Sequence, residues 1–165
     1  MIENKSDEEW VGGDGGPLVV LQAGALPHWE GAVNFDQSIM GGGTLETDYD
    51  VICNCKNHHL RRHNRDMLVL DDSEWCARIY QLENGVIVVE QPYYDSPDTI
   101  KQITESQPTQ SFSIMIEDNL LRLLVGADSA NGDQYGFSEI EITSGTKRCD
   151  VYQFDNVFAI KISPV

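Results

Sequence analysis

Short runs of β-branched and aromatic residues, separated by Gly, Asn, Asp and Pro, recur throughout the sequence. Such runs are typical of β-strands, because an amphipathic helix needs a period of 3.6 residues sustained for about ten residues or more. The pattern therefore predicts nine strands, at residues 18–22, 66–70, 75–82, 86–91, 111–116, 120–125, 137–142, 148–154 and 157–162.

Three connections between these runs are predicted as turns. Residues 83–85 include an Asn-Gly pair, which is a strong hairpin signal, so the strands on either side are predicted to form a hairpin. Residues 117–119 end in Asn, which tolerates the left-handed conformation, and they predict a second hairpin. Gly145 is predicted to turn the strand before it into the strand after it.

Helix signals are few. Ser96 is a candidate N-cap, Pro97 suits the first helical position, and Asp98 suits the first turn of a helix that continues over residues 99–106. A single turn is predicted near residues 26–29. The expected fold is α+β and predominantly β, with antiparallel hairpins of about eight or nine strands and one or two short helices.

The chain is expected to form a single domain over residues 1–165, of which 1–9 form a flexible acidic N-terminus. No linker rich in Pro or in Gly and Ser divides the sequence, and its length favours one domain. The polar, acidic start is the opposite of a secretory signal, and no apolar run approaches the length of a membrane helix. We therefore expect a cytoplasmic protein without membrane contact.

The net charge limits the classes of partner that the chain can bind. The 27 acidic residues outnumber the 11 basic residues, which gives a net charge of −16 and an isoelectric point of about 4.3. Such a surface repels nucleic-acid phosphates and anionic lipids, so direct nucleic-acid binding is not expected. The charge is divided as −9 over residues 1–50, +1 over 51–80 and −8 over 81–165.

The densest cluster of reactive side chains suggests zinc as an alternative function. Its candidate ligands are Cys53, Cys55, His58, His59 and His63. They occupy one short run without a second arm, and neighbouring Lys and Arg residues disfavour a divalent cation. The simpler interpretation is that Cys53 packs on a strand face while the His/Arg stretch forms a solvated loop, with the cysteines as reduced thiols. We expect no metal and no other cofactor.

Catalytic signatures are weak. Cys53 and Cys76 are candidate nucleophiles for a small hydrolase, but the sequence has neither a Gly-x-Ser-x-Gly elbow nor a cysteine-protease signature. The two glycine clusters lack the Gly-Lys-Ser/Thr ending of a phosphate-binding loop. We expect a protein that is not an enzyme. A net charge well beyond the magnitude of about 2 to 8 that suffices for solubility suggests a basic partner instead.

An ordered series of residues resembles a known family. The series includes Trp10, Gly15-Gly16-Pro17-Leu18, Pro27-His28-Trp29, Gly31, Asp48-Tyr49-Asp50, Cys53, Leu68-Val69-Leu70-Asp71-Asp72, Gly85, Tyr94-Asp95 and Asp128-Ser129-Ala130. Over residues 10–130 this series resembles the immunity protein 21 family of bacterial polymorphic toxin systems. The resemblance implies a cytoplasmic, mostly β protein that binds a cognate toxin and protects the cell that makes both.

The charge and this resemblance point to the same partner, a basic toxin domain. A toxin that attacks nucleic acid must be basic, so a nuclease is one candidate. Strand-end residues that combine carboxylate and aromatic character are the predicted toxin contacts: Asp71, Asp72, Glu74, Tyr94 and Asp95. The basic run over residues 56–65 is expected to lie away from the interface.

Overall fold

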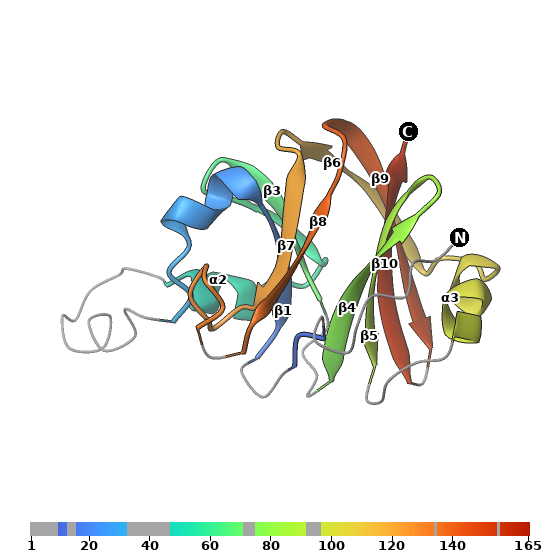
Figure 1. Ribbon diagram of the computed structural model, residues 1–165, viewed down its shortest axis with the longest axis horizontal. Helices are drawn as coiled ribbons and strands as arrows, with labels where there is room; N and C mark the ends of the chain where they lie inside the picture. The colour runs from blue at the N-terminus through green and yellow to red at the C-terminus, as the bar shows by residue number, and fades with distance from the viewer. Residues whose placement is uncertain are drawn as a thin grey trace.

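Two five-stranded antiparallel sheets face each other in the computed structural model, which describes residues 10–12, 16–32, 47–70, 75–91, 97–133, 135–154 and 156–165 (Figure 1). The first sheet has the strand order β2-β3-β1-β7-β8, and the second has the order β4-β5-β10-β9-β6. The strands are β1 (Leu18–Gln22), β2 (His59–Arg62), β3 (Arg65–Val69), β4 (Cys76–Leu82), β5 (Gly85–Gln91), β6 (Gln110–Ile116), β7 (Leu120–Val125), β8 (Phe137–Glu141), β9 (Gly145–Phe154) and β10 (Val157–Pro164).

Short helices cover the outer faces of the two sheets. The 3₁₀ helix η2 (Ala23–His28) and α2 (Asp48–Cys53) lie over the first sheet, and α3 (Pro97–Thr104) lies over the second (Figure 1). Helix α2 begins with a capping box: Thr47 Oγ1 accepts from Asp50 N, and Asp50 Oδ2 accepts from Thr47 N. Helix α3 starts at Pro97, as the sequence predicts.

The main hydrophobic core lies between the sheets, and a smaller core lies under the helices on each outer face. Leu18 and Val20 of β1 point into the main core, whereas Val19 and Leu21 pack outward, in a cluster that includes Trp29. Strand β5 divides its side chains in the same way between the main core and the cluster around α3. Central strands therefore read as continuous apolar runs, because both of their faces are buried.

The predicted fold class, α+β and predominantly β, is confirmed. The structure describes ten strands and three short helices, against the eight or nine strands and one or two helices expected. The β4–β5 hairpin is confirmed, with Leu82 paired to Gly85 across a two-residue turn. Gly85 has a φ of +131°, and a Cβ atom there would lie 2.0 Å from Ile162 O, so this position requires glycine.

Two other predicted hairpins are wrong. Strand β6 pairs with β9 in the second sheet while β7 pairs with β1 and β8 in the first, so residues 117–119 cross between the sheets. Likewise β8 belongs to the first sheet and β9 to the second, so Gly145 does not close a hairpin. Strands β6, β7 and β8 lie within one residue of their predicted bounds, whereas β9 begins at Gly145 and not at Arg148. In both cases the pairing partner is not the strand adjacent in sequence.

A buried glutamine holds the crossing between β6 and β7. The side-chain amide of Gln22 donates to Asp66 O at 2.8 Å and to Met115 O at 2.9 Å. Its Oε1 atom accepts from Glu117 N at 2.7 Å and from Asp118 N at 3.2 Å. One fully buried side chain thus joins β1, β3 and the β6–β7 connection.

Both sheets contribute to the main core. The predicted flexible N-terminus, residues 1–9, lies outside the described residues. Among the helices that are described, none has the length and apolar character needed to span a bilayer.

Candidate functional site

The five predicted toxin contacts fall in two segments outside the described residues. Asp71, Asp72 and Glu74 belong to residues 71–74, and Tyr94 and Asp95 belong to residues 92–96. The described residues next to them show where each segment joins the fold: the first segment leads into β4, and the second follows β5. Cys76 at the start of β4 is the register partner of Gln91 at the end of β5, so the two segments join the described fold at adjacent strand ends.

These strand ends belong to one end of the molecule, called here the lower end and drawn at the lower edge of Figure 1. It is the end at which β1 and β4 begin and β3 and β5 finish; Leu70 N donates to Leu18 O there. The segments 13–15, 71–74 and 92–96 adjoin this end and contain no Lys or Arg. Their acidic residues are Asp14, Asp71, Asp72, Glu74 and Asp95.

Two exposed aromatic side chains lie at the same end. Phe137 starts β8 and is 42% exposed, and Phe154 finishes β9 and is 37% exposed. The Arg122 guanidinium lies over the Phe137 ring, 4.0 Å from its centroid, and also pairs with Glu139. Exposed aromatic side chains are enriched in protein-binding surfaces, so this end is a candidate binding surface.

Most basic side chains in the described part of the chain are already paired with carboxylates. Arg61 pairs with Asp66 and Glu117, Arg62 with Asp48, Arg65 with Asp118, Lys101 with Glu105, Arg122 with Glu139 and Arg148 with Asp150. The guanidinium of Arg65 lowers the pKa of Asp118 more than burial raises it, and a backbone hydrogen bond from Gly24 adds to the lowering. These basic side chains are already engaged within the fold, and the chain still has a net charge of −16.

The basic run at residues 56–65 has a structural role centred on Asp48. This carboxylate is 3% exposed and accepts hydrogen bonds from Arg62 Nε at 2.5 Å, His63 Nε2 at 2.8 Å and Glu30 N at 2.8 Å. Burial raises the pKa of Asp48, but these three hydrogen bonds together hold it below its usual value of 3.8. The network ties β2 to α2 and to the chain after η2.

The predicted solvated loop is instead a hairpin. His59–Arg62 form β2, which pairs with β3 across a turn made by His63 and Asn64, with φ values of +52° and +59°. Two successive left-handed residues are characteristic of a type I′ turn. Its usual sequence signal is Asn-Gly, so the His-Asn pair did not predict this hairpin. Cys53 is also not on a strand face: it ends α2 and is exposed.

The five candidate zinc ligands point to different surroundings. Cys55 Sγ lies 3.7 Å from His59 O, and His58 Nδ1 lies 3.0 Å from Val69 O. The ring of His59 stacks on Phe112, while His63 binds Asp48. Within the described residues, which include all five candidates, no three His, Cys, Asp or Glu side chains are grouped to hold a metal ion. The structure therefore does not assemble the alternative zinc site.

The four cysteines, all described, are free thiols. Cys149 is buried in the main core, and burial, with smaller contributions from Asp150 and Asp66, raises the pKa of its thiol to about 12. A thiol with so high a pKa is an inert packing group, because the thiolate is the reactive form.

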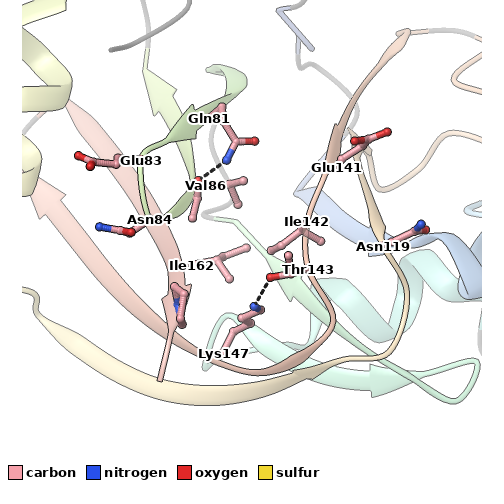
Figure 2. A pocket seen from close by; sticks show the side chains of 12 residues that line it. Gln81, Glu83, Asn84, Val86, Asn119, Glu141, Ile142, Thr143, Lys147 and Ile162 are labelled. Carbon is pink, nitrogen blue, oxygen red and sulfur yellow. Dashed lines mark hydrogen bonds between the residues drawn. The ribbon is translucent and has the colours of Figure 1, made fainter.

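Sequence reasoning missed a groove at the end opposite the lower end, shown in Figure 2. It has a volume of about 500 Å³ and lies between the β4–β5 turn, the β8–β9 connection and Asn119. The groove takes residues from segments far apart in sequence, including the two connections whose hairpins were wrongly predicted. No local motif signals it.

Comparisons of the chain with protein-family models, with curated protein sequences and with solved structures found no match. The resemblance to the immunity protein 21 family therefore rests on the ordered series of residues quoted above.

Proposed function

We propose that this chain is a cytoplasmic immunity protein that binds and neutralises a basic toxin domain, without catalysis and without binding nucleic acid itself. The observation that carries the proposal is the charge distribution. The arginines of the described part are mostly paired within the fold, and the segments 13–15, 71–74 and 92–96, which adjoin the lower end, carry carboxylates and no basic residue. The same end also receives Lys56, two residues before His58, whose O accepts from Val69 N.

Charge of this kind serves recognition more than folding. Self-repulsion in a chain with a net charge of −16 lowers the stability of the free protein. A positively charged partner relieves this repulsion and is attracted from a distance, which raises association rates by about 10- to 1,000-fold. Carboxylates that occupy a nuclease cleft would replace the phosphates of its substrate, so inhibition needs no chemistry from this chain.

The exposed rings of Phe137 and Phe154 complement the charge at the lower end. Charged pairs at the rim of an interface act mainly on encounter, whereas buried aromatic side chains supply much of the binding energy. A contact surface with both components explains how an electrostatically steered complex becomes long-lived.

Growth rescue tests the function. The chain is co-expressed with the C-terminal domain encoded by the gene beside its own, and the purified pair is titrated at increasing salt. We expect restored growth and an affinity that falls steeply as salt rises. Absence of rescue or of complex formation would overturn the proposed function.

A pair of matched variants tests the position of the interface. Asp71→Lys/Asp72→Lys reverses two charges next to the lower end, and Glu83→Lys/Glu141→Lys reverses two at the opposite end. We expect the first variant to lower toxin affinity by about tenfold or more and the second to change it about twofold or less. Tighter binding by the first variant, or equal losses in both, would contradict a lower-end interface while leaving neutralisation intact.

A further inference from the structure

A nearly buried lysine forms part of the groove opposite the lower end. Lys147 is on β9 and is 5% exposed, and the alternation along this strand turns it to the same side as Cys149 and Val151, toward the space between the sheets. Figure 2 shows its Nζ atom beside Thr143. Lys147 is thus a buried residue that lines the groove.

The charge of this ammonium is not balanced within the described part of the chain. Its Nζ donates one hydrogen bond, to Thr143 Oγ1 at 2.7 Å, and forms no ion pair with a described carboxylate. An ammonium has three donors, and burying a cation without a counter-charge costs considerable free energy. The two remaining donors of Nζ have no partner in the described part of the chain and are available to an anionic group that enters the groove.

The other residues that line the groove indicate which chemical class of anion fits it. Val86, Ile142 and Ile162 provide an apolar wall next to Lys147 (Figure 2). Glu83 and Glu141, both exposed, give the groove negative charge that disfavours multiply charged phosphates. A volume of about 500 Å³ is within the range of small-molecule sites, roughly 300–1,000 Å³.

We propose that this groove binds a small organic monocarboxylate, with the carboxylate on Lys147 Nζ and the apolar body against Val86, Ile142 and Ile162. The carboxylate comes either from a free carboxylic acid or from the C-terminal residue of a polypeptide. This site is separate from the proposed toxin interface at the lower end, and its test needs no toxin.

The test titrates hexanoate into the full chain and follows backbone amide signals by NMR. We expect saturable shifts at residues of the groove, and binding at least about tenfold weaker for hexanamide, which lacks the charge, and for inorganic phosphate. Equal binding of hexanoate and hexanamide, or no saturable shift with hexanoate, would refute the proposal.

Variants locate the site. Lys147→Met should weaken hexanoate binding by about tenfold or more, whereas Lys161→Met, which removes the same charge from the neighbouring strand β10, should leave it unchanged. Should Lys147→Met fail to fold, Ile142→Asp serves instead, because it puts a competing carboxylate in the groove and should abolish binding. Full affinity in whichever of these two variants folds would overturn the assignment.

The same titration distinguishes the two sources of the carboxylate. N-acetyl-leucine presents the carboxyl group, apolar side chain and amide of a C-terminal residue. Tighter binding of N-acetyl-leucine than of hexanoate would support a polypeptide C-terminus, and the reverse order would support a free acid. If neither compound binds, the proposal fails.

Discussion

Asp48 shows how one carboxylate can organise a region of the fold. It is among the least exposed charged groups described, yet its pKa stays below 3.8 because Glu30 N, Arg62 and His63 donate to it. A carboxyl group whose pKa is lowered by folding stabilises the folded state above its unfolded pKa. That contribution is lost as the pH falls through the lower pKa of the folded state.

Asp48→Asn should therefore lower the free energy of unfolding by about 1–3 kcal/mol at neutral pH, because it removes the anionic charge that Arg62, His63 and Glu30 N bind. The loss should shrink as the pH falls below 3.8, where Asp48 itself becomes protonated. Urea denaturation at several pH values measures both effects. Glu105→Gln is the control, since its exposed pair with Lys101 contributes little. A pH-independent loss at position 48 would show that charge is not the cause.

At the scale of elements, the sequence specifies strands better than their partners. The run at 18–22 is a strand with the predicted bounds, because its apolar residues fit only a doubly buried strand. The pairing of β6 with β9 was not predictable, since it depends on which sheet each strand buries its apolar face against. The chain does change direction at 117–119. There, Glu117 N and Asp118 N donate to Gln22 Oε1, and the chain crosses from one sheet to the other.

Gln22→Ala tests this role for the glutamine. The substitution removes a buried side chain that bonds four backbone groups, so we expect a loss of about 1–3 kcal/mol in the free energy of unfolding. Gln81→Ala is the matched control, because Gln81 is exposed and bonds only within its own hairpin. Equal losses in the two variants, measured by chemical denaturation, would show that the crossing does not depend on Gln22.

For the molecule as a whole, the sequence indicates the acidic candidate interface, and the structure reveals the groove at Lys147. The acidic excess of the chain could be predicted from composition, because counting charges needs no fold. The structure adds that residues 71–74 and 92–96 adjoin neighbouring strand ends. The groove at Lys147 was beyond sequence reasoning, because a lysine in a strand gives no sign of being buried.

Salt should act in opposite directions on the free protein and on its complex. A net charge of −16 implies self-repulsion, which added salt screens. Raising NaCl from about 20 to about 300 mM should increase the thermal midpoint of the free protein while weakening its binding to the toxin. Calorimetry and titration on one preparation measure both. A midpoint that falls with salt would contradict a repulsive surface.

The strand order of the second sheet has a consequence for folding during synthesis. Its central strand, β10, comes from residues 157–164. On one side β10 pairs with β5, which in turn pairs with β4, and these two strands come from residues 76–91. While the ribosome makes the chain between them, the β4–β5 hairpin has an unsatisfied edge and an uncovered apolar face. Such long-range pairing slows folding and exposes strands to aggregation. A chaperone that holds this hairpin should therefore increase the yield of folded protein.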